Sequence, residues 1–254
     1  MNRLMLKEKS YRDIAGIYDI VELEGQGETR LTNALIAQHL SANGARRVLD
    51  MACGTGAQAI ALHRDGFEVT ASDLNGSMLE VARSKASGLP VEFHEADMVD
   101  VDLGTFDAII AINNAVGHLT PARFAQALRN ASAHLTRGGL LIFDIFDAPM
   151  MVHMPTRPMI DVAVSRGDDR YVRYSSFAFE PASGVLGIRQ TTHVQSGFEP
   201  FATIDEHYQL QTYDRPTLDW LVRKNGFARA SITAEGMPEL HCDSGLSNFV
   251  VCHK

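Results

Sequence analysis

Apolar and polar positions follow two different periods along this chain. Between residues 47 and 146, short apolar runs typical of buried strands alternate with segments whose apolar residues recur every three or four positions, as in helices. Alternating strands and helices predict a parallel sheet built of β-α-β units. The expected strands are residues 47–50, 68–73, 91–96, 106–112 and 140–146.

Helices are expected before and between these strands. Residues 1–46 have a mainly helical pattern, clearest at 29–40, and residues 77–86 carry apolar side chains at helical spacing. Thr120 followed by Pro121 is typical of an N-cap with proline at the first helical position. We expect that helix to end at the Gly138-Gly139 pair.

After residue 147 the pattern changes, and the later part of this region shows the strict alternation that predicts an antiparallel sheet. The proline-containing stretch 149–158 predicts an irregular crossing segment. The alternating runs are 171–180, 185–195 and 202–213, followed by a closing helix at 215–227 and two last strands at 231–234 and 248–252. The chain therefore divides into an N-terminal helical segment (1–46), a core (47–147), an inserted cap (148–214) and a closing part (215–254).

Composition narrows the class of protein. The chain has 254 residues, 45% of them hydrophobic and 21% charged, so we expect a globular protein with a sizeable core. No apolar run approaches the length of a membrane span or a signal peptide, and three unpatterned cysteines favour a reducing cytoplasm. A net charge of −8 without a basic run disfavours nucleic acid as a partner. A homo-oligomer is compatible with the sequence, and no cysteine or histidine spacing predicts a metal site.

The stretch VLDMACGTGAQAIAL carries the first candidate chemistry. Strand, glycine turn and helix follow one another, and the turn fits the G-x-G-x-x-G/A pattern of nucleotide sites, which alone is weakly specific. Asp50 ends the strand at the mouth of this turn, where a carboxylate would repel the pyrophosphate of NAD or FAD. It favours a cofactor with an ammonium and a sulfonium, which S-adenosylmethionine has. An NAD(P)-dependent oxidoreductase is therefore disfavoured.

Acidic residues also follow the next two strands. Asp73 ends the second strand, where a carboxylate accepts hydrogen bonds from ribose hydroxyls. Asp97 ends the third, where it can accept from the adenine amino group, and Met98 offers a backbone N–H and an apolar wall. The alternative is that these carboxylates are solvated loop residues or helix N-caps.

Four segments together resemble a known family. VLDMACGTG, ASDLNGSMLEVAR, HEADM and FDAIIAINNAVGHL are similar to the successive motifs of class I S-adenosylmethionine-dependent methyltransferases. The resemblance runs from Tyr18 to the end of the chain and is strongest to small-molecule N-methyltransferases, both the amino-sugar N,N-dimethyltransferases and the glycine/sarcosine enzymes. It implies an α/β, Rossmann-like fold with a seven-stranded sheet, a reversed final strand and an antiparallel cap over the active site.

The resemblance also implies a cofactor site. Asp50, Gly54 and Gly56 would surround the methionine end, Arg30 would pair with its carboxylate, and Tyr18 would close over the methyl group. The full expected set is Tyr18, Arg30, Asp50, Ala52, Gly54, Gly56, Asp73, Leu74, Met78, Asp97, Met98 and Asn113.

Three residues are candidates for the chemistry of transfer. His118 follows the fourth strand, and an imidazole can take a proton from an amine near neutral pH. Asn114 and the Tyr18 hydroxyl can orient an acceptor by hydrogen bonds. The alternative for His118 is a structural role capping the turn before Thr120.

The acceptor is constrained by two departures from related enzymes. The stretch from Asn113 to Val116 lacks the Pro-Pro-aromatic run with which nucleic-acid methyltransferases stack a flipped base. Asp144-Ile145-Phe146-Asp147 stands where glycine-methylating enzymes place an arginine for the substrate carboxylate. The sequence therefore predicts a cytoplasmic methyltransferase acting on an amine nitrogen of a small metabolite. An O-methyltransferase acting on a hydroxyl or carboxyl group, and a non-catalytic cofactor-binding module, remain as alternatives.

Overall fold

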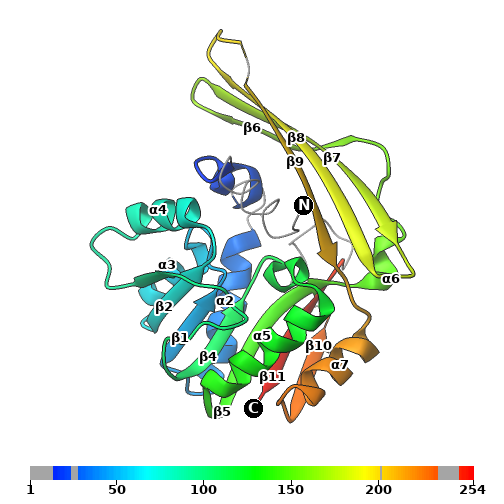
Figure 1. The fold of residues 1–254 in the computed structure, drawn as a ribbon. Helices are drawn as coiled ribbons and strands as arrows, with labels where there is room; N and C mark the ends of the chain where they lie inside the picture. The colour runs from blue at the N-terminus through cyan, green and yellow to red at the C-terminus, as the bar shows by residue number, and fades with distance from the viewer. Residues whose placement is uncertain (1–13, 24–27, 201, 234–245) are drawn as a thin grey trace.

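The protein consists of a seven-stranded core sheet and a four-stranded cap that rises from one end of it (Figure 1). The computed structural model describes residues 14–23, 28–200, 202–233 and 246–254. None of the helices within these ranges combines the length and apolar character needed to cross a bilayer.

The core sheet has the strand order β10-β11-β5-β4-β1-β2-β3. Six strands run in the same direction, whereas β11 runs antiparallel to both of its neighbours, β5 and β10. The strands are β1 (Arg47–Met51), β2 (Glu68–Asp73), β3 (Glu92–Glu95), β4 (Phe106–Ala111), β5 (Leu135–Phe146), β10 (Arg229–Thr233) and β11 (Ser247–His253). The predicted fold class, a Rossmann-like sheet of seven strands with a reversed final strand, is confirmed.

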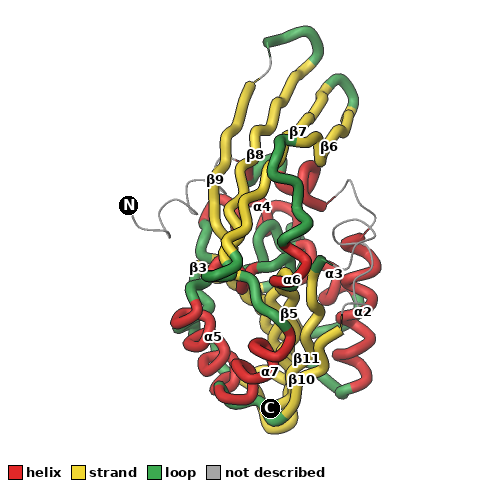
Figure 2. Tube along the Cα trace, turned by 90° about the vertical axis from the view of Figure 1, so that its right-hand side faces the viewer, coloured by secondary structure: helices red, strands yellow, loops and turns green. Residues whose placement is uncertain are grey.

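Helices cover both faces of this sheet (Figure 2). The helices on one face are α2 (Glu28–Ala42), α3 (Ala57–Arg64) and α4 (Gly76–Lys85), and those on the other are α5 (Pro121–His134) and α7 (Arg215–Lys224). Leu62 of α3 and Leu128 of α5 are among the fully buried side chains of the two faces. Burying one such leucine contributes about 1.5–3 kcal/mol, so the two apolar layers hold the strand ends in place.

Several predicted boundaries differ from the structure, and the largest difference lies between α5 and β5. The helix α5 ends at His134 rather than at Gly138-Gly139, and β5 begins directly at Leu135. Leu135 pairs with Phe106 of β4, and the register then shifts so that Leu140 pairs with Ala108. The glycine pair lies in this irregularity, where a Cβ on Gly139 would come within 2.8 Å of the Asp107 carbonyl oxygen.

The cap contains one strand more than the alternating pattern predicted. Its strands are β6 (Met159–Arg166), β7 (Asp169–Glu180), β8 (Val185–Ser196) and β9 (Ala202–Gln211), all antiparallel. The unpredicted β6 is an edge strand with exposed apolar residues such as Ile160, so its burial does not alternate clearly. The crossing segment before it contains one helical turn, α6 (Ala148–Met151).

Two small apolar clusters join the cap to the rest of the molecule. At its base, Phe146 and Met151 pack with Leu186 and Leu210 of the cap. At the other end, Val21 of the π-helical turn η1 (Asp19–Leu23) packs against cap residues of β6 and β7. The N-terminal turn therefore lies between the core and the cap, as Figure 1 shows.

Candidate active site

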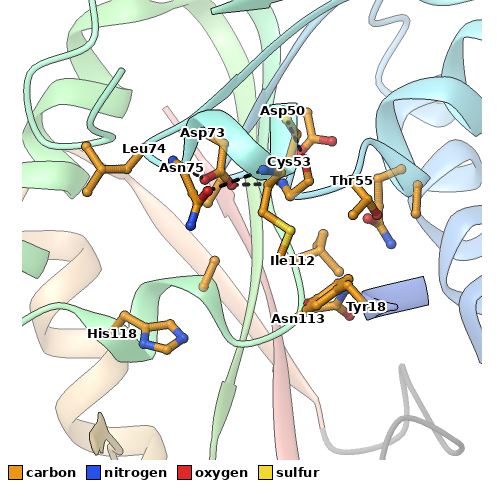
Figure 3. A pocket seen from close by; sticks show the side chains of 16 residues that line it. Tyr18, Asp50, Cys53, Thr55, Asp73, Leu74, Asn75, Ile112, Asn113 and His118 are labelled. Carbon is orange, nitrogen blue, oxygen red and sulfur yellow. Dashed lines mark hydrogen bonds between the residues drawn. The ribbon is translucent and has the colours of Figure 1, made fainter. Parts of the chain in front are cut away.

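A cavity lies at the carboxyl ends of β1, β2 and β4, where open α/β sheets bind ligands. It encloses about 720 Å³ of empty space, including the open mouth. Nine of the residues predicted from the sequence line it: Tyr18, Asp50, Ala52, Gly54, Asp73, Leu74, Met78, Asn113 and His118 (Figure 3). The sequence analysis missed Cys53, Thr55, Ala57, Gln58, Asn75, Ile112 and Ala115, most of which lie beside predicted residues and could have been found from that proximity.

The glycine turn keeps the backbone open to a ligand. Ala52, Gly54 and Gly56 all have positive φ, at 63°, 54° and 80°. A Cβ on Gly56 would lie 3.2 Å from both Ala82 and Phe93, so this glycine is required by helix–strand packing. A Cβ on Gly54 would meet nothing within 4 Å, so space remains there for a ligand to approach the chain.

Asp50 is a buried carboxylate without a full set of partners. It is 1% exposed, and the Ala59 backbone N–H donates to it. Its Oδ2 atom has no hydrogen-bond partner among the described residues. Burial and the neighbouring Asp73 raise the pKa of Asp50 to about 7. An unpaired buried carboxylate in a cavity wall is suited to an ammonium group, so Asp50 fits the methionine end of S-adenosylmethionine.

Asp73 is held rigidly by the backbone. Its Oδ2 accepts the Gly54 N–H at 2.8 Å, and its Oδ1 accepts the Asn75 N–H at 2.8 Å. The side chain of Asn75 caps α4 by accepting from Ser77 and Met78. Each carboxylate oxygen of Asp73 retains a further lone pair, so hydrogen bonding to ribose stays a prediction compatible with this geometry.

The N-terminal turn η1, which directly follows Tyr18, is attached on two sides. Asp19 pairs with Lys85 and Thr55 of the core. Glu22 pairs with Arg173 of the cap. Burial and three neighbouring carboxylates raise the pKa of Tyr18, so its hydroxyl remains protonated and can donate a hydrogen bond.

The segment after β4 forms a tight turn that carries His118. Asn113 and Asn114 have positive φ values of 61° and 54°, and the 3₁₀ turn η2 (Ala115–His118) follows. Asn114 is buried outside the cavity lining, and its Oδ1 accepts the Phe146 N–H at 3.3 Å. Its carboxamide is thus engaged by β5, and its role in orienting an acceptor remains a prediction.

Four other predicted residues also lie outside the cavity lining. Asp97 accepts the Val99 N–H at 3.1 Å and pairs with Arg123. Met98 is buried in the core, Gly56 has the packing role described above, and Arg30 is exposed on α2. The contacts of Asp97 and Met98 with adenine stay predictions. So do the contact of Gly56 with the methionine end of the cofactor and the pairing of Arg30 with its carboxylate. Within the described ranges, no three histidine, cysteine or acidic side chains gather as a metal site would require.

The cap turns a band of polar side chains inward. We call this the cap polar band, and it comprises Arg173, Ser175, Gln190, Thr192, Glu206 and Tyr208. The strand register places Ser175, Gln190 and Glu206 side by side across β7, β8 and β9. Tyr208 donates to Gln190 at 3.1 Å, and its ring lies 5.7 Å from the ring of His118, which lines the cavity. The band therefore reaches the cavity through Tyr208.

The fold and this cavity together define a class of protein. A doubly wound sheet with a reversed last strand, an open glycine turn and an unpaired carboxylate at the end of β1 suits a cofactor with a cationic end and no phosphate. These are the features expected of an S-adenosylmethionine-dependent methyltransferase.

Comparison with known proteins leads to the same class. Residues 48–139 match a family model described as a methyltransferase domain. YqeM of Bacillus subtilis strain 168, a protein classed among the methyltransferases, is 26% identical over 230 residues, 89% of each chain. Glycine N-methyltransferase of Oryctolagus cuniculus is 35% identical over 129 residues, which cover 43% of this chain and 42% of that protein.

A solved structure with bound cofactor is also similar. CalS10, an amino pentose methyltransferase from Micromonospora echinaspora with bound S-adenosylmethionine, has a TM-score of 0.73 and 25% identity, covering 87% of this chain and 90% of that one. The chain is an S-adenosylmethionine-dependent methyltransferase with a methyltransferase domain over residues 48–139. The predicted family and cofactor are confirmed.

Proposed function

We propose that this protein transfers a methyl group to an amine nitrogen of a small metabolite. The observation that carries the proposal is the charge of the cap polar band. Arg173 is the one cation among its six residues, and both Glu22 and Asp161 pair with it. Glu206, buried in the same band, adds a third carboxylate. An excess of carboxylates attracts an ammonium group and disfavours a carboxylate or phosphate at the same position.

The residues around the cavity can meet the needs of such a transfer. S-adenosylmethionine supplies a methyl group on a positively charged sulfur, which needs no further activation by the protein. His118 in the cavity wall takes the proton of the acceptor ammonium, so that the nitrogen lone pair is available. Tyr18 orients the acceptor through its protonated hydroxyl, and the cap excludes water.

The similar proteins support a small amine as the acceptor. The rabbit enzyme is named for glycine and CalS10 for an amino pentose, and both substrates carry nitrogen on a small molecule. Asp144 lies near the end of β5 and Asp147 directly follows it, so this chain has carboxylates where an arginine would bind an amino-acid carboxylate. We therefore favour an amine that carries hydroxyl groups over a free amino acid.

Isotope transfer tests the proposal directly. The protein is incubated with S-adenosylmethionine carrying a ¹³C-methyl group and with matched pairs of acceptors, each an amino sugar and the same sugar with a hydroxyl in place of the amine. We expect ¹³C NMR to show N-methyl product from the amines alone. An O-methyl product from the hydroxyl compounds would instead establish an O-methyltransferase.

A further inference from the structure

The turn that carries His118 begins with two residues in a conformation that side chains other than glycine disfavour. Asn113 and Asn114 are consecutive and both left-handed, with φ values of 61° and 54°. Asparagine tolerates this region better than most residues, but two in succession need support from the surrounding structure. The hydrogen bonds around them identify that support.

Asp144 of the neighbouring strand provides it. Ala111 at the end of β4 pairs with Phe143 of β5, so Asp144 lies beside the first residues after β4. The Asn114 N–H donates to Asp144 Oδ2 at 2.9 Å, and the Asn113 N–H donates to the same carboxylate. Two successive backbone N–H groups of a left-handed turn thus converge on one carboxylate, as in an anion-binding nest.

Stability alone does not account for a carboxylate at this position. Asp144 is 2% exposed, and its Oδ1 has no hydrogen-bond partner among the described residues. Burial raises the pKa of Asp144 to about 7, and the backbone N–H groups of Asn114, Asn113 and Asp144 itself partly offset that rise. An apolar side chain would avoid the cost of burying a charge, as the neighbouring Phe143 and Ile145 do.

We infer that Asp144 is a positioning residue of the active site: its carboxylate holds residues 113 and 114 in the left-handed turn that places Asn113 and His118 in the cavity wall. The remainder of the turn depends on the same arrangement. The Asn114 side chain fills the space beside Gly117, where a Cβ would lie 2.8 Å from Asn114 Oδ1. The chain therefore passes from Asn113 to His118 along one tightly packed path.

The NMR signal of the His118 ring reports on this role of Asp144 without any methyl acceptor present. The chain has ten histidines. In protein with ¹³C-labelled histidine rings, the His118 signal is the one lost in His118→Asn. We expect Asp144→Leu, which removes the acceptor oxygens but fills the space, to move or broaden the His118 signal. We also expect it to weaken S-adenosylhomocysteine binding about tenfold in calorimetry. Asp144→Asn keeps one acceptor oxygen and should restore both measurements most of the way.

Asp107 offers a matched control. Its Oδ2 also accepts two successive backbone N–H groups, those of Arg46 and Arg47 at 3.0 Å each. Asp107 lies at the amino end of β4, away from the cavity at the carboxyl ends of the strands. Asp107→Leu should leave the His118 signal and the binding of S-adenosylhomocysteine unchanged. Asp144→Ala, which leaves room for water, replaces Asp144→Leu in the comparison if the latter fails to fold.

Two results would overturn the inference. One is a folded Asp144→Leu or Asp144→Ala protein with the wild-type His118 signal and wild-type affinity. The other is an equal disturbance by Asp144→Asn and Asp144→Leu, which would show that charge or packing matters rather than the two hydrogen bonds. Neither result depends on the nature of the acceptor, so failure of the proposed amine methylation leaves this test intact.

Discussion

Asp50 combines burial with an unpaired oxygen, and this makes cofactor binding sensitive to pH. Its pKa of about 7 means that the carboxyl is neutral below that pH and charged above it. Only the charged form pairs with an ammonium group. The affinity for a ligand that carries an ammonium should therefore rise with pH up to about 7 and level off above it.

Calorimetric titration with S-adenosylhomocysteine at pH 6, 7 and 8 tests this expectation. Asp50→Asn should weaken binding by about 1–3 kcal/mol and remove the pH dependence, because the amide has no charge to gain. Asp107→Asn, at the amino end of β4, should retain the wild-type dependence of binding on pH. Identical profiles in Asp50→Asn and the wild type would exclude Asp50 as the partner of the ammonium group.

His118 is the residue that separates proton removal from simple positioning of the acceptor. Asparagine can donate and accept hydrogen bonds but cannot take up a proton at neutral pH. We expect His118→Asn to lower turnover by about 10²–10⁴-fold with an amine acceptor, and to remove the rise in rate near neutral pH. A variant with most of its activity and the same pH–rate profile would establish His118 as a cap of its turn.

Arg173 links three elements: β7, which carries it, β6 through Asp161, and the N-terminal turn through Glu22. It is 4% exposed, so its removal leaves two partly buried carboxylates facing each other. We expect Arg173→Met to lower the free energy of unfolding in urea by on the order of 3 kcal/mol. Arg223→Met breaks an exposed pair with Asp219 within α7 and should cost less than about 1 kcal/mol. Equal losses would show that the Arg173 pairs do not fasten the N-terminal turn to the cap.

The cap strands should determine the choice of acceptor while leaving the cofactor site intact. Gln190 faces inward in the cap polar band, whereas its neighbour Thr191 faces outward and bonds Asp205. We expect Gln190→Ala to raise the KM for the acceptor at least several-fold and to leave binding of S-adenosylhomocysteine unchanged. Thr191→Ala should affect neither. Equal loss of cofactor binding in Gln190→Ala would assign this strand to the fold or the cofactor site.

For the molecule as a whole, the choice of cofactor should be visible in thermal stability. A ligand at one hundred times its dissociation constant stabilises the folded state by about 2.7 kcal/mol, which for a chain of this size is roughly 5–10 °C in Tm. S-adenosylhomocysteine should produce this shift and NAD should not, because Asp50 stands where a pyrophosphate would lie. A shift with NAD alone would contradict the cofactor assignment. The cytoplasmic location and the homo-oligomer remain predictions.

Much of the core could be predicted from the sequence because its determinants are local. Apolar runs of strand length and the N-cap at Thr120 mark elements that form wherever they stand in the chain. Parallel strands place their carboxyl ends at one edge, so Asp50, Asp73 and His118 could be assigned to a common site before any contact was known. The predictions failed where pairing between strands decided the outcome. The end of α5 is set by the pairing of β5 with β4, and β6 forms as an edge strand that pairs with β7 alone.

What only the tertiary structure decided are contacts between segments far apart in the chain. Arg173 and Glu22 are 151 positions apart, and no local period encodes their pairing. Tyr208 reaches His118 only because β9 of the cap packs against η2, and Asp144 supports the turn after β4 only because β5 lies beside it. Local patterns fix which way a side chain points within its own element. Which distant side chain it meets is fixed by how the elements pack.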